Sequence, residues 1–67
     1  MRCFVNGVEH DFEHATLCCE ALLEHIGVPK DGLIAEIDGK VFTVTQFKEA
    51  VIKDGSKVEF IRMMGGG

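Results

Sequence analysis

The sequence has no cluster of basic residues, no long apolar run and no even set of cysteines. Its 7 Lys and Arg are outnumbered by 11 Asp and Glu, so the electrostatic footprint of a nucleic-acid-binding protein is missing. Its apolar runs are only a few residues long, which excludes a membrane-spanning helix. The first residues reach Asn6-Gly7, a turn sequence, too early for a signal peptide. We therefore expect a cytoplasmic protein that binds neither nucleic acid nor membranes.

The three cysteines, Cys3, Cys18 and Cys19, do not form a disulfide framework, because their number is odd and two of them are adjacent. His10 and His14 lie nearby, but there is no CxxC pair and the spacing is not that of a zinc site. We therefore predict no metal site, with core thiols and surface imidazoles. A redox or persulfide-accepting role for Cys18 or Cys19 stays open, since a position near a helix N-terminus can lower the pKa of a thiol such as Cys19.

Three turn dipeptides divide the chain into strands and helix. Asn6-Gly7, Asp38-Gly39 and Asp54-Gly55 are sequences typical of tight turns. Apolar and polar residues alternate beside most of them, which predicts strands. The predicted strands cover residues 1–5, 8–13, 33–37, 40–42 and 57–63.

Between the second and third strands, the pattern of apolar residues predicts a helix over residues 16–26. Thr16 is placed to cap its start, Gly27 to end it in a left-handed conformation, and Pro29 to prevent its continuation. A second, short helical turn begins at Thr43. It is expected to carry three apolar side chains inward, Phe47, Ala50 and Val51.

This order of elements predicts an α+β fold of the β-grasp, or ubiquitin-like, type. Its mixed sheet has four to five strands, and one main helix covers one face. The first and last strands can lie parallel at the centre because a long right-handed crossover joins them. With only 67 residues there is room for one small core. We expect residues 1–64 to form this domain and residues 65–67 to be a flexible glycine tail.

The sequence ends in Gly65-Gly66-Gly67, directly after the last predicted strand. Residues without a Cβ atom can enter a channel too narrow for any side chain. The carboxylate of Gly67 can then be delivered into the active site of a partner, where ATP activates it. Since no convincing catalytic cluster is present, we expect a carrier rather than an enzyme, with sulfur held as a thiocarboxylate on Gly67.

Apolar residues on the last strand and the first predict a partner-binding patch. Alternation assigns Cys3, Val5, Val58 and Phe60 to the core. The helix covers only one face of the sheet, so other apolar side chains remain on the open face near the tail. These are Phe4, Ile61 and Met63, to which the predicted patch adds Met64.

Over its whole length the chain resembles the ThiS family of sulfur carriers in thiamine biosynthesis. The resemblance rests on residues 1–7, on residues 41–58 and on the ending 61–67. Within 41–58 it rests on Thr43, Gln46, Phe47, Val51, Asp54-Gly55 and Val58. One departure is Cys19, which stands where the family often has an acidic residue three positions after the capping Thr.

The resemblance implies a fixed set of partners. An E1-like adenylyltransferase (ThiF-like) would adenylate Gly67 with ATP and Mg²⁺, which the partner binds. A cysteine desulfurase or another persulfide donor would supply sulfur, and thiazole synthase (ThiG-like) would accept it. Gly66 and Gly67 would carry the functional role of the family.

The Gly-Gly ending is shared with the small subunit of molybdopterin synthase (MoaD) and with ubiquitin. A MoaD-like subunit, a ubiquitin-like protein modifier, a carrier for another sulfur pathway and a β-grasp binding module therefore remain alternatives.

Overall fold

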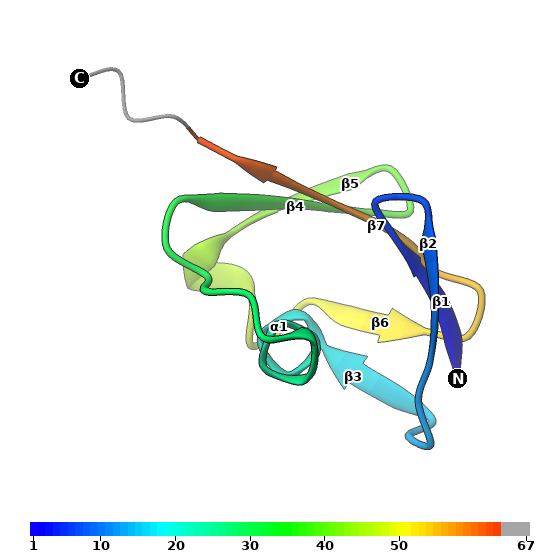
Figure 1. Cartoon of the computed structure of the whole chain (residues 1–67). Coiled ribbons are helices and arrows are strands. Elements are labelled where there is room, and N and C mark those ends of the chain that lie inside the picture. The colour runs from blue at the N-terminus through cyan, green and yellow to red at the C-terminus, as the bar shows by residue number, and fades with distance from the viewer. Residues whose placement is uncertain (64–67) are drawn as a thin grey trace.

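Five strands form one mixed sheet in the computed structural model, which describes residues 1–63. The strands are β1 (Arg2–Val5), β2 (Val8–Asp11), β4 (Leu33–Ile37), β5 (Lys40–Thr43) and β7 (Lys57–Arg62). Their order is β2-β1-β7-β4-β5, with β1 and β7 parallel and the other neighbours antiparallel (Figure 1). The predicted β-grasp arrangement, with the first and last strands adjacent and parallel, is confirmed.

The helix α1 (Cys19–Ile26) is shorter than the predicted helix, and Thr16 does not cap it. The cap residue is Cys18, which is extended and whose Sγ accepts a hydrogen bond from the Ala21 N–H at 3.4 Å. At the other end Gly27 has φ 74°, and so confirms the predicted left-handed end of the helix.

A second, two-stranded sheet explains why the helix begins late. The strand β3 (Thr16–Cys18) pairs antiparallel with β6 (Val51–Lys53) on the side of the main sheet where α1 lies (Figure 1). The backbone N–H of Cys19 donates to the carbonyl of Ala50 at 2.8 Å. Tertiary pairing thus holds residues 16–18 as a strand, and it overrides the local helical pattern.

Beyond β5 the chain forms the 3-10 turn η1 (Val44–Gln46), as the capping-box spacing predicted. The Gln46 side-chain oxygen accepts the Thr43 backbone N–H at 2.9 Å. Phe47 and Ala50 are buried as expected, but the inward placement of Val51 was wrong. Val51 is 59% exposed, because its strand buries only its middle residue, Ile52.

The core lies between the main sheet and α1 with the small sheet. Cys3, Val5 and Val58 are buried as predicted, and Phe60 is half-buried with its ring centroid 6.4 Å from that of Phe47. The remaining buried apolar residues are Leu17, Cys19, Leu22, Leu23, Leu33, Ala35, Ile37, Phe47, Ala50 and Ile52. Within residues 1–63, no helix is long and apolar enough to cross a membrane.

Candidate functional site

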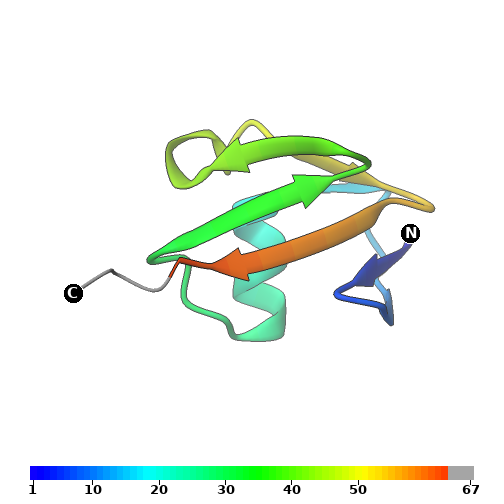
Figure 2. The ribbon, with the colours of Figure 1, turned by 90° about the horizontal axis from the view of Figure 1, so that it is seen from above.

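The main sheet leaves one face open, because α1 and the small sheet cover the other (Figures 1 and 2). Side chains on a strand alternate between the two faces, so pairing register places each open-face residue beside a known neighbour. On β7 the open-face residues are Lys57, Glu59 and Ile61, and Met63 continues this spacing. Along β7 the open face therefore changes from charged to apolar.

The apolar end of this face is larger than the sequence predicted. Ile61 is 52% exposed and Met63 is 58% exposed. Ile34 on β4 lies directly opposite Ile61 and is half-buried. Val41 on β5 lies diagonally across from Ile34 and is 58% exposed. We call Ile34, Val41, Ile61 and Met63 the apolar surface. Sequence reasoning missed Ile34 because every residue of β4 except Glu36 is apolar, so hydrophobicity does not distinguish its two faces.

The predicted patch also included Phe4. This residue lies on the open face but not beside the apolar surface. Its register partner on β7 is Lys57, four residues before Ile61. At the rise of a strand this separates the two by about 13 Å. Phe4 is half-buried and forms part of the wall of two hollows.

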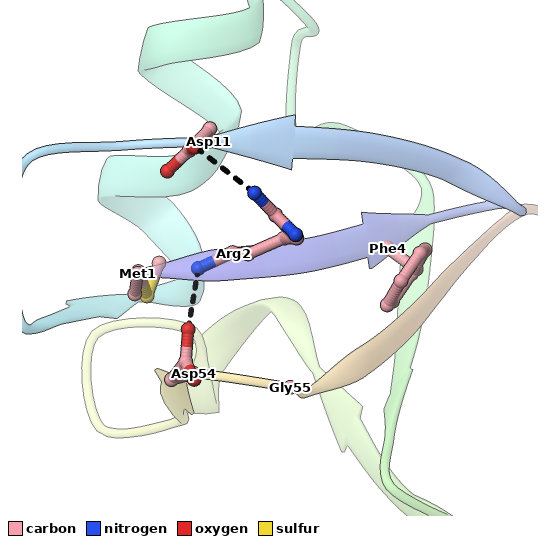
Figure 3. A pocket seen from close by; sticks show the side chains of 6 residues that line it. All are labelled: Met1, Arg2, Phe4, Asp11, Asp54 and Gly55. Carbon is pink, nitrogen blue, oxygen red and sulfur yellow. Dashed lines mark hydrogen bonds and ion pairs between the residues drawn. The ribbon is translucent and has the colours of Figure 1, made fainter.

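The larger hollow, of about 350 Å³, is polar and lies beside Phe4 at the start of β1 (Figure 3). In it the Arg2 guanidinium pairs with Asp11 at 3.8 Å, and the Arg2 backbone N–H donates to Asp54 Oδ1 at 2.8 Å. The second hollow, of about 280 Å³, is lined by Phe4 together with Gly7, Lys57, Val58 and Glu59. The charged groups of the larger hollow thus already have partners within the chain.

The end of β7 is held to the loop that precedes β4. The Met63 N–H donates to the Gly32 carbonyl at 2.6 Å, and the Arg62 guanidinium donates to the Asp31 carbonyl at 3.0 Å. These bonds fix the point from which the chain continues to its last residues, next to the apolar surface. The predicted site residues Met64, Gly65, Gly66 and Gly67 lie outside the described residues.

The three cysteines occupy different environments. Cys3 and Cys19 are buried, and Cys18 is half-buried. Burial, together with Cys18 and Glu20, raises the pKa of Cys19 to about 12, so the lowered pKa considered from sequence was wrong. The reason is that Cys19 points into the core, whereas the capping position belongs to Cys18.

Two histidines, His10 and His25, contact the Phe12 ring, and the third, His14, contacts His25. The His10 and Phe12 rings stack with their centroids 6.0 Å apart, and the centroid of His25 lies 5.3 Å from those of both Phe12 and His14. Among residues 1–63, no three His, Cys, Asp or Glu side chains are grouped so that they could hold a metal ion.

Comparison with known proteins finds a family model, solved structures and a longer protein that are similar to this chain. A model of the ThiS family matches residues 2–67. The crystal structure of the thiamine biosynthesis protein (ThiS) from Geobacter metallireducens is similar, with a TM-score of 0.85 and 32% identity over the full length of both chains. An NMR solution structure of a thiamine biosynthesis protein from Geobacter metallireducens has a TM-score of 0.72 and 33% identity, covering 100% of this chain and 88% of that one.

A curated relative is much longer than this chain. It is the thiazole synthase of Paramagnetospirillum magneticum (strain ATCC 700264 / AMB-1), which is 30% identical over 67 residues. The match covers all of this chain but only 20% of the length of that protein.

Proposed function

This chain belongs to the ThiS family, and from that membership we propose that it is a sulfur carrier of thiamine biosynthesis, with the sulfur held on the carboxyl group of Gly67. The observation that carries the proposal is the extent of the family match, which runs from residue 2 through all three terminal glycines. Full-length similarity to a ThiS structure supports it.

The proposed chemistry needs no side chain of the carrier. A Gly67 carboxylate oxygen attacks the α-phosphate of ATP on an E1-like activating enzyme, which binds Mg²⁺, and pyrophosphate leaves. A persulfide sulfur then attacks the acyl-adenylate and AMP leaves, which gives an acyl disulfide. A second thiol cleaves that disulfide, so that Gly67 keeps one sulfur as a thiocarboxylate and the donor ends as a disulfide. A cysteine desulfurase is the proposed source of the persulfide.

Glycine at positions 65 and 66 suits this chemistry, because a chain without Cβ atoms enters a narrow channel that excludes other residues. In the proposal the apolar surface docks on the activating enzyme while the last residues reach its nucleotide. The geometry favours separate roles for the apolar surface and the glycines. The hydrogen bond from Met63 to Gly32 holds the chain beside Ile61 at the point where the last residues follow.

Thiazole synthase is the proposed acceptor of the sulfur. The support is that a protein named thiazole synthase contains, within a fifth of its length, a segment similar to this whole chain. In that protein a segment similar to this chain and the rest of the enzyme are parts of one polypeptide. This arrangement favours the interpretation that the carrier and the synthase act on each other.

Intact-mass analysis tests the proposal. The carrier is incubated with the ThiF-like enzyme of its own organism, MgATP, a cysteine desulfurase and cysteine. We expect the mass to rise by the difference between sulfur and oxygen, located by fragmentation at Gly67. A variant without Gly66 and Gly67 is the matched control and should not change. Conjugates to lysine, or no change of the full chain, would contradict the proposal.

A further inference from the structure

Two glutamates face each other on the open face of the sheet. Glu36 on β4 and Glu59 on β7 are direct register partners. Side chains at such positions have their Cβ atoms about 5 Å apart, and like charges there are destabilising. The pair therefore weakens the sheet in the isolated protein, and its presence needs a reason.

Within residues 1–63, no ion pair joins a cation to either glutamate. The ion pairs of that segment join Arg2 to Glu9 and Asp11, and Lys30 to Glu20. The cation nearest the pair on the open face is Lys57, two residues before Glu59 on β7 and about 7 Å away. Lys40 on β5 is the register partner of the buried Ile37, so it belongs to the other face, where its Nζ lies 5.7 Å from the centroid of the Phe42 ring. Glu59 is exposed and Glu36 is half-buried, and neither forms an ion pair within residues 1–63.

The glutamate pair is continuous with the apolar surface. The neighbouring open-face pair along the same two strands is Ile34 with Ile61, only two residues away, or about 7 Å. A protein that covers Ile61 must therefore also approach Glu59 and remove water from it. Burying a carboxylate without a partner is costly, and a hydrogen-bonded cation offsets that cost.

We propose that Glu36 and Glu59 together bind one basic side chain, an arginine or a lysine, of the activating enzyme that docks on the apolar surface. This inference rests on the proposed function for the identity of the partner. An arginine fits best, because its planar guanidinium can donate to two carboxylates at once. The net charge of −4 on the carrier also favours a partner whose docking surface is basic. The pair thus destabilises the free carrier slightly and favours the complex.

The test compares Glu36→Gln and Glu59→Gln with a matched control, Glu24→Gln, whose glutamate is exposed on α1. Binding of the purified ThiF-like enzyme is measured by calorimetry at low and high salt, adenylation by ATP–pyrophosphate exchange, and stability by urea unfolding. We expect Glu59→Gln and Glu36→Gln each to weaken binding about tenfold and to reduce its salt dependence. Their urea midpoints should equal or exceed that of the wild type, and Glu24→Gln should bind normally.

The outcomes separate this inference from the proposed function. If the wild type is adenylated and both variants bind as Glu24→Gln does, the basic partner is refuted and the carrier function stands. If the variants bind weakly but the wild type is never adenylated, the function fails and the docking inference survives. A lower urea midpoint for Glu59→Gln would overturn the argument that the pair is repulsive, and a wild type that does not bind would overturn both.

Discussion

The side chain of Asn6 pairs with the backbone of Phe60 as a neighbouring strand would. Its Oδ1 accepts the Phe60 N–H at 2.7 Å, and its Nδ2 donates to the Phe60 carbonyl at 3.2 Å. Asn6 has φ 49° in the turn between β1 and β2, a conformation that asparagine tolerates better than most residues. The turn residue thereby extends the contact between β1 and β7 beyond the end of β1.

We predict that Asn6→Gly lowers the free energy of unfolding by about 1–2 kcal/mol, because two hydrogen bonds are lost. Glycine adopts the positive φ without strain, so the loss reports mainly on the side chain. Urea unfolding measures the change. An unchanged midpoint would show that water replaces the Asn6 side chain at no cost.

Ile61 is predicted to serve docking rather than folding. Ile61→Asp should lower kcat/KM for adenylation by at least about tenfold, because it places a charge in the centre of the apolar surface. The free energy of unfolding should change by less than about 0.5 kcal/mol, since the side chain is 52% exposed. The control is Val51→Asp, which changes a residue that is 59% exposed on β6, and it should leave adenylation unchanged. Equal loss of stability and activity in Ile61→Asp would refute the docking role.

Asp38 gives the stability a defined dependence on pH. The Lys57 N–H, which donates to Asp38 Oδ1 at 2.9 Å, is the main group that holds the pKa of this carboxyl below its ordinary value of 3.8. A group with a lowered folded-state pKa stabilises the protein fully above its unfolded pKa. That contribution is lost as the pH falls through the lower folded value.

We therefore expect the stability advantage of the wild type over Asp38→Asn to shrink as the pH falls below about 4. Asparagine keeps the acceptor oxygen and tolerates the observed φ of 50°, so the comparison isolates the charge. Urea unfolding from neutral to acidic pH provides the measurement. A constant difference at every pH would contradict the prediction.

Only one of the three thiols is predicted to react in the native protein. Cys18 is half-buried, whereas Cys3 and Cys19 are buried and burial raises the pKa of both thiols. Iodoacetamide at mildly alkaline pH should therefore label Cys18 first, and all three positions only after unfolding. Peptide mapping by mass spectrometry reads the sites, and Cys18→Ser should abolish native labelling. Equal labelling of Cys19 would mean that the helix start opens readily.

Much of the fold could be predicted because the signals are local. Asn6-Gly7, Asp38-Gly39 and Asp54-Gly55 mark turns through backbone conformations that few residues adopt, and all three Gly residues have positive φ in the structure. Gly27 ends the helix for the same reason. The start of the helix was missed because pairing between β3 and β6, residues distant in sequence, competes with helix propensity over residues 16–18.

The sequence by itself determined the order of elements, the membership of the core on β1 and β7, and the family to which the chain belongs, because turns, alternation and a continuous match are properties of local sequence. Only the tertiary structure decided which open-face residues are neighbours of one another. Register between β4 and β7 placed Ile34 beside Ile61 and Glu36 beside Glu59, and register between β1 and β7 placed Phe4 away from them. Strand register depends on long-range hydrogen bonds, so no local pattern could reveal these neighbours.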